Sequence, residues 1–398
     1  MTHAARAAAE RAARASYGRL VAVLARQSGD IAAAEDALSA ALSKALEVWP
    51  RDGVPERPEA WLTTAAKRLV QNTWRHAGVR GAAEPDLVRM AQGSGETDTT
   101  HDPRLDLMFV CAHPAIVQEV RTPLMLQTVL GLTADRIAAA YVLPKAAMAQ
   151  RLVRAKSKIR QARIPFRKPE PEELPERLPP VLDAIYAAFG QSWEDADTSI
   201  AQEALFLAEL IVTLLPEEPE AQGLFALMCY VEARRPARRT AEGAYVPLDD
   251  QNPRDWDRSL LLRAEGVLHR AARAARPGRY QTEAAIQSLH SQRAFGRASD
   301  PQMLVTAHRA LLAQHPSLGA AVSCAGALLS AGHVSEAKAQ LAAIDDDLAA
   351  QYQPYWAVLA EVQLTLGEPI SAAAQAIRLA QDPAVQAHLA TRFGLTTP

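Results

Sequence analysis

The sequence is poor in aromatic residues and has no long apolar run. Phe, Trp and Tyr make up only 5% of its 398 residues, although 49% are hydrophobic, most of them Ala and Leu. No run reaches the 18 to 20 or so apolar residues that a membrane-spanning helix needs. No segment alternates apolar and polar residues between turn signals, as a half-buried strand does. We therefore expect an all-α chain that does not enter the membrane.

Cysteine is also scarce, and the usual catalytic motifs are missing. Cys111, Cys229 and Cys324 are scattered without paired spacing, which is typical of a reducing cytoplasm. The cationic N-terminus has no apolar core and does not resemble a secretory signal. No Gly-rich phosphate loop, GxSxG or HExxH occurs, so we expect neither an enzyme nor a cofactor. Cys111 and His113 are too few ligands for zinc, which favours a buried thiol and a capped histidine.

Charge is distributed unevenly along the chain. Residues 1–166 carry 23 Lys and Arg against 16 Asp and Glu, a balance of +7. The remaining residues carry 20 against 29, a balance of −9. A basic front and an acidic back indicate a polyanionic partner for the front alone, and the modest excess does not imply tight non-specific DNA binding.

Residues 124–162 predict a helix, a turn and a helix that ends in a ladder of cations. Gly131 and Thr133 are placed to end one helix and cap the next, and Pro144 to start the last helix near Lys145. Along that helix the cations repeat on one face and an apolar stripe on the other. The cations are Arg151, Arg154 and Lys158, and the stripe is Met148, Leu152, Ala155 and Ile159. The pattern favours a helix-turn-helix DNA reader, with a solvated amphipathic helix of a bundle as the alternative.

A second candidate interface lies nearer the N-terminus. Residues 16–49 predict two helices separated by Gly29 and Asp30, and the second carries a buried stripe at Leu38, Leu42, Ala45 and Trp49. Carboxylates at its start stabilise the helix dipole or form a docking surface for a basic partner. The next helix, from Pro58, can face Leu62, Ala65 and Leu69 inward. Its outer face combines cations, amides and a Trp, which suits unpaired bases, with a solvated face as the alternative.

Composition divides the chain further. Residues 77–103 are rich in small and polar residues and predict a flexible linker, and the Pro-rich segment 164–177 predicts a second one. Residues 178–398 predict a series of amphipathic helices. Two segments in it match at an offset of 35 residues, which indicates a tetratricopeptide-like array. The matched residues are Gly332, Ala337, Ala339 and Gln340 with Gly367, Ala372, Ala374 and Gln375.

One acidic insert, residues 241–258, interrupts this helical series. Asp249, Asp250, Asp255 and Asp257 gather in it beside Trp256. Several carboxylates could hold a hard cation, but their spacing does not match the calcium-loop pattern. We therefore expect no metal site, and interpret the insert as a packed loop that anchors Trp256.

This order of segments resembles the extracytoplasmic-function sigma factors of the sigma-70 superfamily, in the subgroup with a long C-terminal helical extension. The stretches that carry the resemblance are GDIAAAEDAL, ALEVWPRDGVPERPEAWL, FVCAHPA, AMAQRLVRAKSKIRQARIPF, LLPEEPEAQGLFALM and DDQNPRDWDR. It covers nearly the whole chain and weakens after about residue 290. It implies a cytoplasmic, non-enzymatic protein that directs transcription initiation. Its expected partners are the clamp of the RNA polymerase core, promoter DNA and, through the C-terminal array, a protein regulator.

The resemblance also implies domains and residue roles. Region 2 would span residues 1–76, region 4 residues 104–163, and the array residues 178–398. The implied −35 contacts are Lys145, Gln150, Arg151, Arg154, Lys156 and Lys158. The implied −10 contacts are Trp61, Lys67, Arg68, Gln71, Asn72, Trp74 and Arg75. The implied polymerase-docking residues are Glu35, Asp36, Ser39 and Leu42.

The chain departs from the family pattern at several positions. Family members usually carry a Gln-Glu pair and an aromatic residue in the docking helix, where this chain has Ser39, Ala40 and Leu42. Arg68 and Asn72 stand where the family tends to have Asn and Asp. The alternative reading is therefore a degenerate sigma-like interaction protein, which binds a protein or small ligand through its array and does not initiate transcription.

Overall fold

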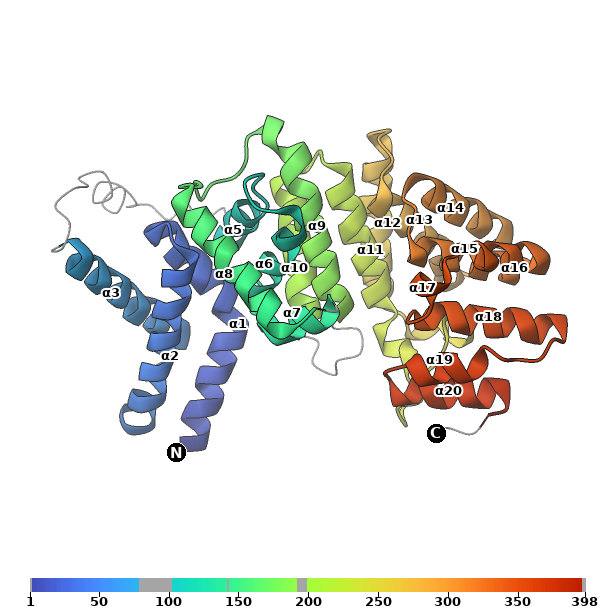
Figure 1. Cartoon of the computed structure of the whole chain (residues 1–398), viewed down its shortest axis with the longest axis horizontal. Coiled ribbons are helices and arrows are strands. Elements are labelled where there is room, and N and C mark those ends of the chain that lie inside the picture. Colours follow the sequence, from blue (N-terminus) through green and yellow to red (C-terminus); the bar gives the residue numbers. More distant parts are fainter. Residues whose placement is uncertain (1, 79–101, 142, 192–198, 396–398) are drawn as a thin grey trace. The chain divides into compact units, whose positions relative to one another are not determined.

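The computed structural model describes residues 2–78, 102–141, 143–191 and 199–395. Within these ranges the chain is helical apart from turns, short 3-10 helices and an isolated bridge between Arg239 and Tyr245 (Figure 1). The all-α prediction is therefore confirmed. No helix in this part of the chain is long and apolar enough to cross a membrane. The chain divides into two compact units, Met1–Leu210 and Ile211–Pro398.

Three helices open the first unit: α1 (Thr2–Ser28), α2 (Ile31–Asp52) and α3 (Pro58–Gly78), each packed against the other two. Gly29 has a φ of +66°, and the Asp30 carboxylate accepts the N–H groups of Ala32 and Ala33 at 2.9 and 3.3 Å. This is the predicted break and cap, which satisfies backbone donors that a helix start leaves free. The predicted stripe of α2 is buried except at Leu42, which is partly exposed.

The remaining helices of the first unit pack onto the opening three or onto one another. They are α5 (Pro103–Cys111), α6 (Gln118–Thr128), α7 (Ala134–Ala140), α8 (Lys145–Gln161) and α9 (Leu174–Gln191), with α10 (Ser199–Leu214) crossing the unit boundary. Helix α5 lies against α1, α8 against α2, and α9 against α5 and α6. Most of the predicted linker 77–103 lies outside the described residues, and the predicted domain boundaries stay predictions.

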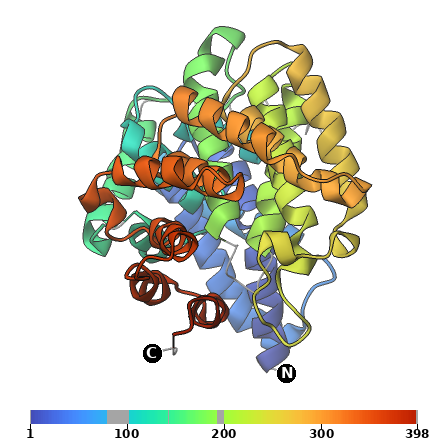
Figure 2. The ribbon, with the colours of Figure 1, turned by 90° about the vertical axis from the view of Figure 1, so that its right-hand side faces the viewer.

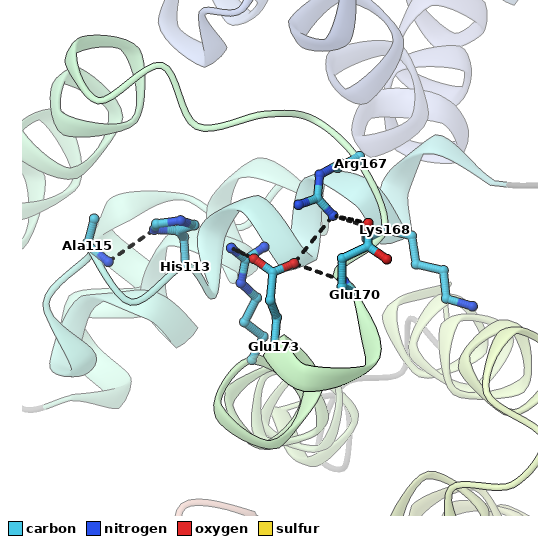
Figure 3. A network of polar contacts seen from close by, with 7 residues as sticks. His113, Ala115, Arg167, Lys168, Glu170 and Glu173 are labelled. Atoms are coloured by element: carbon cyan, nitrogen blue, oxygen red, sulfur yellow. Dashed lines mark hydrogen bonds and ion pairs between the residues drawn. The ribbon is translucent and has the colours of Figure 1, made fainter.

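The Pro-rich segment 164–177 holds more structure than a linker needs. A 3-10 helix, η1 (Pro171–Glu173), leads directly into α9, which begins inside the segment at Leu174. Glu170 and Glu173 form a reciprocal capping box at this entry. Figure 3 shows Glu173 reaching the guanidinium of Arg167, at 3.3 Å. Glu173 also pairs with the buried guanidinium of Arg177 at 2.9 Å. Local ion pairs therefore order a stretch whose proline content predicts only an absence of helix.

The second unit is a series of helices joined by short turns, apart from the longer connection between α11 and α12 that contains the acidic insert. They are α11 (Pro219–Ala233), α12 (Arg258–Arg273), α13 (Arg279–Ser291), α14 (Pro301–Gln314), α15 (Leu318–Ser330), α16 (Val334–Ala342), α17 (Asp346–Ala349), α18 (Gln353–Leu366), α19 (Ala373–Leu379) and α20 (Pro383–Phe393). Successive helices pack mainly on their neighbours in the chain, and Figure 2 shows α18, α19 and α20 nearly end-on and side by side. Alanines together with larger aliphatic and aromatic residues fill the core between the helices.

The two matched sequence segments form equivalent turns. Gly332 joins α15 to α16 with a φ of +83°, and Gly367 follows α18 with a φ of +68°. Both angles fall in the left-handed region that glycine adopts without steric cost. Ala337 and Ala372, at the same offset from these glycines, are buried. The internal repeat thus corresponds to two helical hairpins, and a tetratricopeptide-like array remains a prediction.

Candidate nucleic-acid interface

Helix α8 has the predicted start and the predicted inner face. Pro144 is its N-cap residue, and its apolar stripe of Met148, Leu152, Ala155 and Ile159 is buried. The stripe packs on α6 and α7. Thr133 caps α7 through its hydroxyl, which accepts the N–H of Arg136 at 3.3 Å, and Gly131 turns the chain before it with a φ of +67°. The local signals in the sequence therefore place α7 and α8 correctly.

The outer face of α8 presents three cations to solvent. Arg151, Arg154 and Lys158, called the cationic row below, are all exposed. Gln150 and Lys145 are also exposed, and Lys145 pairs with Asp135 at 2.5 Å. The charge of the cationic row is therefore available to phosphate groups, which Arg and Lys bind in nucleic-acid interfaces.

Lys156, also expected at DNA, has a different environment. Its side chain is only 9% exposed, and its ammonium lies 2.5 Å from Glu35 Oε2 on α2. Glu35 in turn lies beside Tyr17, and burial followed by the charge of Glu35 raises the pKa of Tyr17. Lys156, which is expected to contact DNA, is therefore paired with Glu35, which is expected to dock on polymerase. Their expected roles require this pair to separate.

Close backbone contacts reinforce this closed arrangement of the first unit. A Cβ added to Gly18 on α1 would lie 1.8 Å from the carbonyl oxygen of Val129, just after α6. Tyr17 lies against Gly131, whose added Cβ would be 3.2 Å from the ring. Arg160 at the end of α8 pairs with Asp30 at 3.2 Å. Residues of the expected regions 2 and 4 are therefore in intimate contact.

The α3 helix begins at Pro58 as predicted, but its buried face is shifted by one residue from the predicted face. Leu62, Ala66 and Val70 are the buried positions, whereas Leu69 is 36% exposed, so its expected inward orientation is wrong. Trp61 is partly buried and stacks edge-on against Trp49, with ring centroids 5.5 Å apart.

The expected −10 contacts are only partly described. Lys67 is partly exposed and Arg68 is exposed on α3. The side chains of Gln71, Asn72, Trp74 and Arg75 lie outside the described residues.

The expected docking face of α2 has an exposed edge. Asp36 and Ser39 are exposed, and Leu42 is partly exposed. Sequence reasoning missed Leu46, which is 47% exposed and lies seven positions after Ser39, on the same face of the helix. The seven-residue spacing from Ser39 is the sequence pattern that could have identified Leu46 as part of the docking face. An exposed leucine beside polar residues is a feature that a protein partner can cover.

Two further predictions outside this interface are settled by local contacts. Cys111 is buried 3.6 Å from the Thr128 hydroxyl, and burial raises its pKa to about 12. His113 Nδ1 accepts the N–H of Ala115 at 3.1 Å (Figure 3). Burial, followed by the nearby Arg177 guanidinium, lowers the pKa of His113. The buried thiol is therefore confirmed, and a local hydrogen bond holds the ring of His113.

The acidic insert is anchored by Trp256, as expected. Trp256 is 4% exposed, and its indole N–H donates to the Gln251 side chain at 3.2 Å. Asp257 caps α12 by accepting the N–H groups of Ser259 and Leu260. No group of three or more metal-ligating side chains is found among the described residues.

Comparison with known proteins matches two parts of the chain. Residues 13–79 match sigma-70 region 2, and residues 177–272 match DUF6596, a family of unknown function. The chain is 34% identical to the uncharacterized protein R00370 of Rhizobium meliloti (strain 1021) over 298 residues, which cover 71% of this chain and 70% of that one. The two chains therefore belong to the same family. No solved structure matches.

Proposed function

We propose that this chain, which belongs to the sigma-70 family by its region 2, is an extracytoplasmic-function sigma factor. It would bind the RNA polymerase core, recognise promoter DNA and direct transcription initiation, without being an enzyme. In this proposal α2 docks on the polymerase clamp, α3 contacts the opened −10 element, and α8 enters the major groove of the −35 element. The observation that carries the proposal is the exposed cationic row on a helix that follows a capped turn.

The chemistry of the two helices supports a division of labour. The cationic row suits the phosphates of duplex DNA, and Gln150, exposed nearer the start of the same helix, has the amide geometry that pairs with adenine. On α3 the sequence combines amides, cations and Trp74, which suit unstacked bases.

The Glu35–Lys156 pair implies that function needs an opening step. While the pair is closed, one docking acid and one cation are neutralised. We therefore propose that the closed first unit is a resting form, which polymerase or DNA opens by offering new partners to these two groups. The second unit would regulate this step or receive a protein signal, as helical arrays often bind proteins.

A reconstitution experiment tests the proposal. Purified chain is mixed with core polymerase, and the DNA recovered with the complex is sequenced. We expect stable co-elution, enrichment of promoter fragments and run-off transcription from them. A variant with all three residues of the cationic row changed to Ala serves as the matched control, which should keep polymerase but lose promoter DNA. Co-elution without transcription from any genomic fragment would refute initiation.

The second candidate function is a degenerate sigma-like interaction protein. Ser39 and Ala40, in place of the family's polar pair, favour this candidate because they remove side chains that could hydrogen-bond to polymerase. It predicts no stable co-elution with core polymerase. Restoring the pair with Ser39→Gln and Ala40→Glu separates the two candidates. Recovery of co-elution would show a weakened docking surface, and continued failure would favour the interaction protein.

A further inference from the structure

Three arginines gather where α11 ends, in the second unit. They are Arg234, Arg235 and Arg238, the last two in the 3-10 helix η2 (Arg235–Arg238). Two histidines lie in the same neighbourhood, His290 on α13 and His308 on α14. Burial, followed by the charge of Arg234 and by His308, lowers the pKa of His290 to about 4. Arginine and histidine side chains from the end of α11, from α13 and from α14 therefore meet at one place.

Arg234 is the most deeply buried member of this cluster. The residue is 5% exposed, and its Nη2 donates to the side-chain oxygen of Gln287. Its Nη1 is buried and has no hydrogen-bond partner among the described residues. Burial alone lowers the pKa of Arg234 to about 10, and no carboxylate counteracts it. A buried charge without a counter-charge is strongly destabilising, so native chains rarely keep one without a partner.

The end of α11 supplies part of the missing negative charge. Arg238 Nη2 donates to the carbonyl of Val231 at 3.1 Å, and Arg235 Nε donates to both oxygens of Glu232 at 2.8 Å. A helix C-terminus adds roughly half a negative charge. Neither of these acceptors is bonded to the guanidinium of Arg234, whose side-chain partner is Gln287. Burial and then Arg235 and Arg234 lower the pKa of Arg238 to about 9 despite Glu232.

The neighbouring Arg293 does not share this imbalance. Its guanidinium donates to the backbone carbonyls of Leu248, Asp249 and Gln251 at 2.9 to 3.0 Å and lies over the Trp256 ring. Arg293 therefore has a structural role in anchoring the acidic insert, whereas Arg234 has no comparable set of acceptors.

We propose that Arg234 and Arg238 form the centre of a binding site for a phosphate group, with Arg235, His290 and His308 around them. Guanidinium groups match the oxygens of phosphate with paired hydrogen bonds, and a phosphate would supply the counter-charge that the buried Arg234 lacks. The ligand would enter beside Arg235 and Arg238, which are partly exposed, and would accept a hydrogen bond from Arg234 Nη1. This site lies wholly in the second unit and does not depend on the proposed role in transcription.

Thermal unfolding of the full chain tests this site. Melting is followed in inorganic phosphate and in chloride at matched ionic strength, with a nucleoside monophosphate as a third arm. We expect 10 mM phosphate to raise the melting temperature by about 5 °C over chloride. A larger rise with the nucleotide would identify a phosphate ester as the ligand, and an equal or smaller rise would identify free phosphate.

Two variants and a control make the test specific. Arg234→Met should abolish the phosphate-induced rise and raise the melting temperature without ligand, because it removes the unbalanced charge. Arg254→Gln changes an exposed arginine of the nearby insert and should leave the rise unchanged. If Arg234→Met does not fold, Arg238→Gln is used, and calorimetry should show at least tenfold weaker phosphate binding. No rise over chloride, or a rise that persists in the folded variant, would overturn the proposal.

Discussion

The closed first unit makes a quantitative prediction about Glu35. Glu35→Gln removes the carboxylate that lies 2.5 Å from the ammonium of Lys156, whose side chain is 9% exposed. Breaking a buried ion pair from one side costs about 3–5 kcal/mol when both groups are fully buried. Glu35 is 19% exposed, so we expect a smaller cost of about 2 kcal/mol, which is roughly a 30-fold shift toward the open form.

Distance measurements between two introduced labels report this shift. Ser39→Cys on α2 and Gln161→Cys on α8 place thiols at exposed positions, while the native cysteines are buried. Pulsed electron paramagnetic resonance should show a broader and longer distance distribution in the Glu35→Gln background. Asp36→Asn is the matched control, because Asp36 is an exposed acid next to Glu35 on the same helix, and it should leave the distribution unchanged.

A rescue experiment checks the cause. Exchanging the charges with Glu35→Lys and Lys156→Glu should restore much of the closed population that either single change loses, because the pair is regenerated with reversed polarity. If Glu35→Gln leaves both the distance distribution and the melting temperature unchanged, the ion pair does not hold α8 against α2, and the resting-form interpretation is wrong.

Three other outcomes follow from the contacts of the first unit. Gly18→Ala should lower the unfolding free energy by about 1–3 kcal/mol because its Cβ would overlap a backbone carbonyl, while Gly190→Ala, with open space around it, should raise it by about 0.5–1 kcal/mol in denaturant titrations. Removing the three charges of the cationic row should reduce the slope of log affinity against log salt by about 3 in promoter binding, and an unchanged slope would exclude α8 from the phosphates. Burial raises the pKa of Cys111 from 9.0 to about 12. The protonated thiol therefore makes its full contribution to the stability of the folded state below pH 9, and this contribution is lost as the pH rises toward 12. Relative to a Cys111→Ala variant, wild type should lose about 1 kcal/mol of stability between pH 8 and pH 10, and parallel pH profiles would contradict this reading.

Local signals explain which parts of the fold the sequence predicts well. Asp30, Thr133 and Pro144 act on backbone groups within a few residues, so the helix starts they mark are visible without tertiary information. The stripe of α8 is equally clear because its two faces differ strongly in polarity. On α3, apolar residues occur at both Leu69 and Val70, and packing against the neighbouring helices selects Val70. A periodic pattern of apolar residues does not determine which of two adjacent apolar positions on a helix is buried.

Long-range pairs explain what the sequence could not predict. Lys156 lies at the edge of the buried stripe of α8, and only the fold brings Glu35, 121 positions earlier, against it. Arg234 begins a short basic run, and the buried guanidinium donates to Gln287 on α13, 53 positions later. The Pro-rich segment 164–177 is ordered by ion pairs around Glu173. The Lys156–Glu35 and Arg234–Gln287 contacts join residues 121 and 53 positions apart, which carries no local signal, whereas the Glu173 pairs are local and were masked by the proline content.

The position of Lys156 couples the two proposed binding events. In the closed form the cationic row offers three charges, and Lys156 is held by Glu35. A polymerase surface that binds α2 through Glu35 would release Lys156 beside the row and so add one phosphate contact to DNA binding. Polymerase and DNA would therefore strengthen each other's binding, and the effect must be reciprocal. We expect the salt slope of promoter binding to increase by about 1 when core polymerase is present, from this residue alone. A Lys156→Gln variant should lose this increment and keep the contribution of the cationic row. An equal polymerase-dependent increment in wild type and variant would show that Lys156 remains away from DNA even after the pair has opened.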